Sequence, residues 1–370
     1  MAHASERRIV LPSSSQPRAS IVIAADRNAD LLAACLRSLE SNVGPALPIE
    51  TIIVLNGSPE PVARLVRECV AGVRVVESGV NRGVAGGYNL GRENAQGEFL
   101  VLLHDDVEVW PDWLEALVET ADELQEAGAV GSRTLNADGT LQAAGAIVWR
   151  DGMTEPLGRG EPADTPAHGA RRRVDYCGSN SLLVRATTWD AVGGLDERFF
   201  PAYYVDVDLG MKIRERGQVV LCEPRSQVTH HRWGFETASS YRLFAAQRNQ
   251  RLFVEKWRSA LESHVRQGDG TVEEALLRVR QERPTTTVSS PQQRPRPDAD
   301  YLRDELAVKD AYLSALERRH AEAAEAARHA AHLRQELVGI QNSRIWRLHG
   351  RLLPLFRLIS RVKPSRSAVP

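Results

Sequence analysis

Residues 19–104 alternate short apolar runs with amphipathic stretches, and this alternation limits the fold more than any other feature of the sequence. The runs ASIVIAA, IETIIVLN, VRVVES and GEFLVLLH have the length of strands, whereas DLLAACLRSLESNV and PEPVARLVRECVAG have helical spacing. Strands that alternate with helices form a parallel sheet with right-handed crossovers. We therefore predict an α/β fold whose ligand lies at the carboxyl ends of the strands.

Composition divides the 370 residues into five segments. Residues 1–18 are predicted to be a disordered tail, residues 19–263 a globular body, and residues 264–300 a flexible linker rich in Pro, Thr, Ser and Gln. Residues 301–341 are predicted to be one long helix, and residues 342–370 a basic amphipathic segment. We expect the catalytic and ligand-binding residues to lie in the globular body.

The predicted helix at 301–341 carries apolar residues at alternating spacings of three and four. They are Leu302, Leu306, Leu313, Leu316, Ala323, Ala327, Ala330 and Leu337. Lys309, His320 and Arg334 interrupt the same seam. Two arrangements are therefore open: a coiled coil with a second copy or a partner protein, or a single helix docked on its own body.

The balance of charges and the scarcity of cysteine disfavour several protein classes. The 47 Lys and Arg residues match 48 Asp and Glu residues, so no basic field points to a nucleic acid partner. The four cysteines are scattered, and the chain has neither the pattern of a signal peptide nor 18 consecutive apolar residues. We expect a protein of the reducing cytoplasm.

The run LVLLHDDVEVW delivers two carboxylates to the end of a predicted buried strand. One or two carboxylates typically hold a hard divalent cation on phosphates, while water and substrate oxygens fill its other positions. We predict Asp106 as the first ligand of such a cation, with Asp105 in support. A solvated turn with capping aspartates is the alternative.

A glycine-rich segment, NRGVAGGYNLG, follows the third predicted strand. Gly83 and the later glycines allow close backbone approach to a ligand, and Asn81, Arg82 and Asn89 offer hydrogen-bond donors near a helix start. Neither G-x-G-x-x-G after the first strand nor a GK[ST] phosphate loop occurs. Dehydrogenase and P-loop functions are therefore disfavoured.

The segment RFFPAYYVDVDLG leads aromatic residues into two carboxylates at a predicted helix start. The helix dipole favours an ionised carboxylate there, which suits a general base, so we assign the base role to Asp206 and the capping role to Asp208. Capping alone is the alternative. In the later run SQVTHH, strand alternation places His230 on the face of Val228, as a third metal ligand or as a structural histidine.

The order of these motifs resembles family-2 inverting glycosyltransferases of the GT-A fold, especially the bacterial rhamnosyltransferase-like branch. The matching runs, within about residues 19–258, are IETIIVLNGS, NRGVAGGYNLG, LLHDDV, NADGTLQAAGAIV, YCGSNSLLVR, GGLDERFFPAYYVDVDL and VTHH. The resemblance implies a Rossmann-like, mostly parallel sheet flanked by helices. It also implies a nucleotide-diphosphosugar donor, a lipid-linked or glycan acceptor, and a divalent cation, Mn²⁺ or Mg²⁺.

The resemblance also implies roles for single residues. Asn56 would contact the nucleobase, Asp106 and His230 would hold the cation on the diphosphate, and Asp206 would be the base. Gly178, in the segment Cys-Gly-Ser, would lie beside donor and acceptor. The other residues expected to bind the nucleotide-sugar are Asn81, Arg82, Gly83, Asn89 and Asp105. The implied enzyme is a hexosyltransferase of cell-surface polysaccharide or glycolipid synthesis.

Three positions depart from the family's usual residues. Ala25 and Leu55 stand where Thr and Asp are common, which leaves the choice of nucleobase open. Val205 replaces a Glu, but the neighbouring Asp206 is retained. The retained carboxylate favours an active enzyme over the alternative, a non-catalytic scaffold of the same fold.

After Glu336 the chain contains no acid, whereas its Arg and Lys residues are interleaved with Trp346, Phe356 and aliphatic residues. Such a segment is typical of binding to an anionic membrane surface, here the inner membrane that carries lipid-linked acceptors. Packing on a partner protein is the alternative. The first interpretation predicts a peripheral enzyme on the cytoplasmic face of the membrane.

Overall fold

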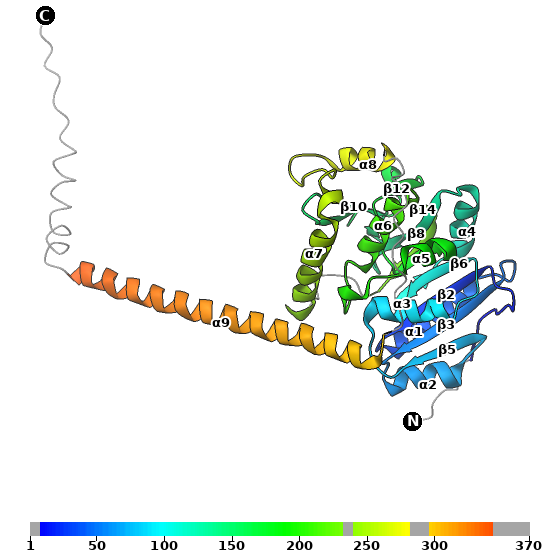
Figure 1. Cartoon of the computed structure of the whole chain (residues 1–370), viewed down its shortest axis with the longest axis horizontal. Helices are drawn as coiled ribbons and strands as arrows, with labels where there is room; N and C mark the ends of the chain where they lie inside the picture. Colours follow the sequence, from blue (N-terminus) through cyan, green and yellow to red (C-terminus); the bar gives the residue numbers. More distant parts are fainter. Residues whose placement is uncertain (1–7, 232–239, 282–295, 343–370) are drawn as a thin grey trace, which may run out of the picture. The chain divides into compact units, whose positions relative to one another are not determined.

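The computed structural model describes residues 8–231, 240–281 and 296–342 (Figure 1). The chain divides into two compact units, Met1–Val308 and Lys309–Pro370. The first unit contains the central sheet and the helices that cover it. Residues 343–370 of the predicted basic segment lie outside the described residues.

The predicted alternation of strands and helices is confirmed in the first half of the sheet. Four strands pair in parallel in the order β5-β3-β2-β6: β2 (Ala19–Ala25), β3 (Ile49–Asn56), β5 (Val73–Ser78) and β6 (Phe99–His104). They are connected by α1 (Ala29–Asn42), α2 (Glu60–Cys69) and α3 (Gly83–Glu93). The carboxyl ends of β3, β2 and β6 therefore lie side by side.

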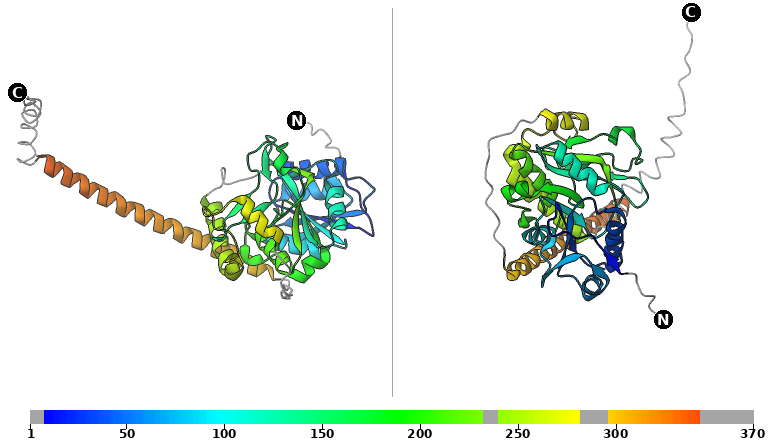
Figure 2. Two further views of the ribbon diagram at one scale, coloured as in Figure 1. Left: turned by 90° about the horizontal axis from the view of Figure 1, so that it is seen from above. Right: turned by 90° about the vertical axis from the view of Figure 1, so that its right-hand side faces the viewer.

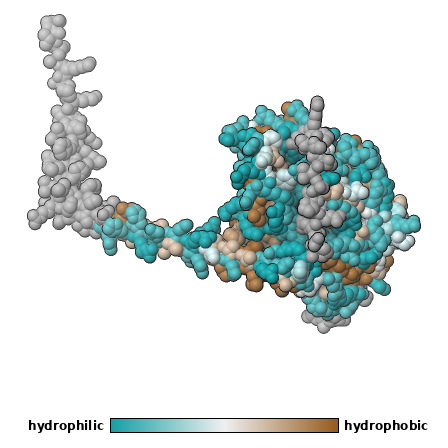
Figure 3. All heavy atoms as spheres, viewed as in Figure 1, coloured by the Kyte–Doolittle hydropathy of each residue, from teal (hydrophilic) through white to brown (hydrophobic). Residues whose placement is uncertain are grey.

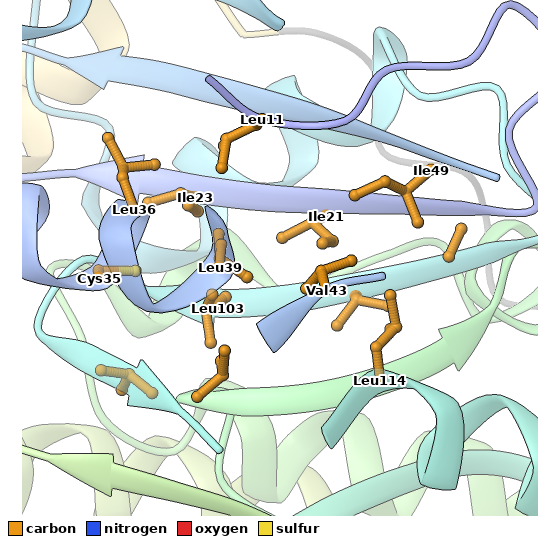
Figure 4. Packing of buried hydrophobic residues seen from close by; sticks show 14 of the residues in the cluster. Leu11, Ile21, Ile23, Cys35, Leu36, Leu39, Val43, Ile49, Leu103 and Leu114 are labelled. Carbon is orange, nitrogen blue, oxygen red and sulfur yellow. The ribbon is translucent and has the colours of Figure 1, made fainter. Parts of the chain in front are cut away.

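The strand alternation of β2 sends side chains into two separate cores. Ile21 and Ile23 face the cluster that includes α1, whereas Val22 packs in the cluster that includes Ala85 and Tyr88 of α3. Figure 4 shows the first cluster, where the α1 side chains approach β2 and β6. Helices thus cover both faces of the sheet, as the further views in Figure 2 also show.

The second half of the sheet is mixed, which the sequence did not predict. Strand β13 (Ser181–Arg185) lies antiparallel between β6 and β8 (Ala127–Leu135), and β14 (Val219–His230) runs parallel to β8. Shorter strands complete the sheet: β7 (Val107–Val109), β9 (Leu141–Ala143) and β12 (Arg172–Val174). Four helices cover this half of the sheet: α4 (Trp113–Glu123), α5 (Ala186–Val192), α6 (Val205–Glu215) and α7 (Ser240–Leu261).

Part of the predicted N-terminal tail is folded. Strand β1 (Ile9–Val10) pairs in parallel with β4 (Val70–Ala71). Ile9 and Leu11 are buried, because they join the core cluster beneath α1 and α2. The predicted disorder of residues 8–18 is therefore wrong: two apolar side chains outweigh the polar composition around them.

Part of the predicted linker is also folded. Helix α8 (Val272–Gln281) lies within it, and Ala275 and Val279 are buried. Its Arg278 donates to both carboxylate oxygens of the fully buried Asp175, at 2.5 and 2.7 Å. Composition misses this segment because its ion pair with Asp175 joins residues about 103 positions apart.

The long helix predicted at 301–341 is confirmed as α9 (Asp298–Asn342). Tyr301 and Val308 are buried, so the first turns of the helix pack within the first unit. Leu313 and Leu333 further along are exposed, and Figure 3 shows this stretch as mostly hydrophilic with isolated apolar positions. In the described parts of the chain, no helix is both long and apolar enough to cross a membrane.

Candidate active site

Three possible metal ligands converge where β6 and β14 end. His104 is the last residue of β6, Asp106 lies in the turn that follows, and His230 is the last residue of β14. One ligand atom from each lies within 4.8 Å of the others. The His230 Nε2 atom is 3.2 Å from Asp106 Oδ1, and His104 Nδ1 is 3.9 Å from the same oxygen. The structure thus brings the two predicted ligands together.

The orientation of His230 is set by a residue that the sequence reasoning missed. Gln142 of β9 is buried, and its Oε1 atom lies 2.9 Å from His230 Nδ1. Because Gln142 Nε2 donates to Asn136 Oδ1, the Oε1 atom is the one that faces the ring. His230 then donates from Nδ1 and keeps the lone pair of Nε2 towards Asp106. This is the tautomer that a metal ligand requires.

His104 was not predicted as a ligand, although it directly precedes the two carboxylates. Its ring stacks on Tyr88 with centroids 6.3 Å apart and meets His230 edge-on at 5.5 Å. Burial lowers the pKa of His104 to about 4, although Asp106 opposes the shift. The neutral imidazole therefore offers a lone pair to a cation.

Asp105 supports the site by joining two strand ends. Its Oδ2 atom accepts the backbone N–H of Asp26 at 2.7 Å, which ties the turn after β6 to the end of β2. The carboxylate is buried, as is that of Asp106. The alternative of a solvated Asp-Asp turn is therefore excluded by the burial of both residues.

Four residues predicted to bind the donor lie together: Asn56 at the end of β3, and the three residues of the turn Asn81–Gly83. The Asn56 side chain donates to Gly83 O at 3.0 Å and accepts from Arg82 N at 2.9 Å. Asn81 Oδ1 accepts from Gly83 N at 2.7 Å. Gly83 has φ of 67°, and a Cβ there would lie 2.7 Å from Pro201 O, so only glycine fits. The Asn56 amide thus holds the donor-side turn, Asn81–Gly83.

Asn89 forms its side-chain hydrogen bonds outside the donor-side turn. Its amide nitrogen donates to Leu195 O and to Glu197 Oε1, both at 2.9 Å, and its oxygen accepts from Leu195 N at 3.0 Å. These bonds occupy both donors of the amide. Asn89 therefore fixes the segment that leads to the aromatic residues, and its binding of nucleotide-sugar stays a prediction.

Asp206 lies at the start of α6 and contacts the segment of Gly178. Its carboxylate accepts from Ser179 N at 3.3 Å and from Val207 N at 3.0 Å. Burial raises the pKa of Asp206, although these N–H groups oppose the shift. The Ser179 hydroxyl also lies 3.4 Å from His104 Nε2. Ser179 therefore links the predicted base, Asp206, to the cluster of three possible metal ligands.

The backbone before Asp206 is held in an unusual conformation. Tyr203 and Tyr204 have φ of 72° and 65°, which costs of order 1–3 kcal/mol for each non-glycine residue. Asn249, fully buried in α7, donates to Ala202 O at 2.7 Å and to Tyr203 O at 3.3 Å. Helix α7 thus holds the strained segment that presents Asp206.

The predicted capping role of Asp208 is wrong. Tyr204 occupies the cap position of α6, and Asp208 is completely buried in the first turns of the helix. Its Oδ1 atom accepts from Trp257 Nε1 at 2.8 Å and lies 2.6 Å from Lys256 Nζ. Sequence spacing could not reveal these partners, because both come from α7.

Comparisons with known proteins find similar sequences and similar structures. The chain is 30% identical over 240 residues to O-antigen biosynthesis protein RfbC of Myxococcus xanthus, a match that covers 60% of the chain and 18% of that protein. It is 28% identical over 207 residues to N-acetylglucosaminyl-diphospho-decaprenol L-rhamnosyltransferase of Mycobacterium tuberculosis, covering 50% and 67% respectively. The chain thus spans only a small part of the first relative.

Among solved structures, GalNAc-T7 with UDP, GalNAc and Mn²⁺ superposes with a TM-score of 0.52 at 16% identity, over 68% of this chain and 50% of that one. The predicted GT-A fold is confirmed by this likeness. The family model for Glycosyl transferase family 2 matches residues 20–177, which include Asn56, Asp106 and the donor-side turn. Residues 20–177, less than half of the chain, thus match a glycosyl transferase family 2 domain.

Proposed function

We propose that this protein is a metal-dependent inverting glycosyltransferase, which moves a sugar from a nucleotide-diphosphosugar to a hydroxyl acceptor in bacterial surface polysaccharide or glycolipid synthesis. The observation that carries the proposal is the link through Ser179 between Asp206 and the cluster of His104, Asp106 and His230. The printed names of the O-antigen and rhamnosyltransferase relatives support the assignment to surface polysaccharides.

The donor atoms of the cluster fit a divalent cation. His104, Asp106 and His230 supply two imidazoles and one carboxylate, a set that favours Mn²⁺ over Mg²⁺, because Mg²⁺ prefers oxygen ligands alone. When bound, the cation supplies positive charge that stabilises the departing nucleotide diphosphate. Gln142 contributes by keeping the Nε2 lone pair of His230 directed at the cluster.

Asp206 is proposed to take the proton of the acceptor hydroxyl. The deprotonated oxygen attacks the anomeric carbon in line, the bond from that carbon to the diphosphate oxygen breaks, and the configuration inverts. A base is most effective when its pKa lies near the working pH, so the raised pKa of Asp206 favours this role. The N–H of Ser179 holds the carboxylate in place.

The donor-side turn is proposed to bind the nucleoside part of the donor. Asn56 fixes the backbone of Arg82 and Gly83, and the turn lies after β5, near the ends of β3 and β2. This is the edge at which parallel α/β sheets bind ligands. The departures at Ala25 and Leu55 lie at the same strand ends, so the nucleobase must be identified by experiment.

A screen of nucleotide-diphosphosugars tests the proposed function, with released nucleotide diphosphate as the readout. We expect turnover of at least one donor with Mn²⁺ and an acceptor, and none with EDTA. Asp106→Asn should abolish turnover and leave the melting temperature nearly unchanged, whereas Asp30→Asn on the exposed start of α1 should behave as wild type. A wild-type protein that binds nucleotide-sugars without any metal dependence would instead be the non-catalytic scaffold.

A further inference from the structure

The first turn of α9, more than 200 positions after the donor-side turn, packs directly against it. Arg82 donates from Nη2 to Asp298 Oδ1 at 2.7 Å and from Nε to Ser78 Oγ at 2.9 Å. The guanidinium carbon of Arg82 also lies 5.0 Å from the centre of the Tyr301 ring, within cation–π distance. The side chain of Arg82 is therefore oriented by α9.

Tyr301 is the central residue of this contact. It is only 2% exposed, and its hydroxyl donates to Glu197 Oε2 at 2.8 Å. The other oxygen of Glu197 accepts from Asn89 of α3. A Cβ at Gly86 would lie 2.9 Å from Tyr301 Cε1, so the ring fills the space above the first turn of α3. Tyr301 thus contacts α3 directly and through Glu197.

The opposite side of the same turn contacts the aromatic segment before α6. Val84 N donates to Pro201 O at 2.8 Å, and a Cβ at Gly83 would lie 2.9 Å from Phe200 Cδ2. The turn is therefore held between the segment that leads to Asp206 and the start of α9. Both supports come from outside residues 20–177, the range that the family model matches.

We propose that Tyr301 is a positioning residue for the donor site, and that residues 296–308 therefore belong to the functional unit. The ring holds Arg82 and the start of α3 in the conformation that receives the nucleotide. This inference rests on the proposed function, since it assigns a role in that same site. Tyr301 touches no reacting atom, so its loss should weaken nucleotide binding and leave the chemical step intact.

Hydrogen exchange in the full-length chain tests the structural half of the proposal. In Tyr301→Ala, the amides of α3 should exchange about tenfold faster than in wild type, because local opening becomes easier. Leu302→Ala is the matched control, since Leu302 is the next residue of α9 and is 48% exposed. Exchange in α3 that is identical in both variants would overturn the proposal.

Binding of nucleoside diphosphates with Mn²⁺, measured by calorimetry, tests the functional half. We expect Tyr301→Ala to weaken the Kd about tenfold, and Gly86→Ala to do the same, because its Cβ would clash with both Arg82 Cβ and the Tyr301 ring. Tyr301→Phe should lie in between, since it keeps the ring and loses the bond to Glu197. The kcat of an active donor should change less than about twofold in Tyr301→Ala.

The outcomes separate this inference from the proposed function. A wild-type protein that binds a nucleotide but turns over no sugar donor would contradict the transferase, while the Kd values would still report on Tyr301. Faster exchange in Tyr301→Ala with an unchanged Kd would show a purely structural role and overturn the inference. Wild-type protein that binds no nucleoside diphosphate with Mn²⁺ would overturn both.

Discussion

Gln142 offers a sharp test of the metal site, because its only proposed role is to orient one ligand. Its Oε1 atom accepts from His230 Nδ1 at 2.9 Å, and the two residues are 4% and 7% exposed, so water has little access to replace the bond. Replacing Gln142 by Ala leaves a buried N–H without its acceptor and allows the ring to rotate or to change its tautomer. Loss of such a supporting bond typically costs about 10- to 100-fold in metal affinity.

We therefore expect Gln142→Ala to bind Mn²⁺ about 10- to 100-fold more weakly, a loss of about 1.4–2.7 kcal/mol of binding free energy. Calorimetric titration of the full chain with Mn²⁺ measures this directly. Gln142→Glu restores an acceptor at the same position and should bind at least as tightly as wild type. Gln227→Ala is the matched control, since Gln227 lies on the same strand as His230 but forms no described hydrogen bond to the cluster.

An unchanged Mn²⁺ affinity in Gln142→Ala would refute the argument that this residue orients His230. Equal losses in Gln142→Ala and Gln227→Ala would also refute it, because a general loosening of the strands would then explain both. Melting temperatures of the two variants show whether a loss of affinity comes from general loosening of the strands or from the lost bond to His230. The expected pattern is a loss of affinity for Gln142→Ala alone.

Three further predictions concern the ion pair of Asp175, the proposed base and the basic segment. Arg278→Ala should lower the free energy of unfolding by about 3 kcal/mol in urea titrations, because it removes one ion-pair partner of the buried Asp175. Arg280→Ala, on the exposed face of α8, is the control and should lower it by less than about 0.5 kcal/mol. Equal losses in both variants would contradict the role of the ion pair. Because the pKa of Asp206 is raised, the base should take up a proton at a pH above 3.8, the ordinary pKa of this carboxyl group. We therefore expect kcat to fall with decreasing pH before pH 3.8 is reached. A kcat that stays constant down to that pH would argue against Asp206 as the base. The protein of 370 residues should float with anionic vesicles at low salt and be released from them by high salt. A chain ending at residue 342 should not float. If the 370-residue protein does not bind the vesicles, a partner protein is favoured as the ligand of the basic segment.

The features that depend on the local pattern of residues, such as buried strands and the residues that follow them, were mostly predicted from the sequence. The bounds of β2 and β3 agree with the predicted runs because both strands are buried on both faces and read as continuous apolar stretches. Asp106 and His230 were found because residues after strands meet at one edge of the sheet. The burial of His230 also agrees with the predicted alternation along β14.

What the sequence did not predict depends on contacts between distant segments. Gln142 and His230 meet only because β9 and β14 both pair with β8, and the pairing of short antiparallel strands has no clear local signal. The hydrogen-bond partners of Asn89 were not predicted because they lie about 106 positions away, beyond any helical spacing. Truncation at the start of the predicted linker would remove Arg278 and Tyr301 together, so a shortened chain should keep at least residues 1–308.

The separate roles of Asp106 and Asp206 are the central claim, and Asp206→Asn tests it most directly. Nucleotide-sugar binding with Mn²⁺ and turnover with acceptor should be measured on the same preparation. We predict a donor Kd within about threefold of wild type and a turnover reduced by at least about 10²-fold, because only proton removal is lost. Near-normal turnover by Asp206→Asn with acceptor present would contradict the account.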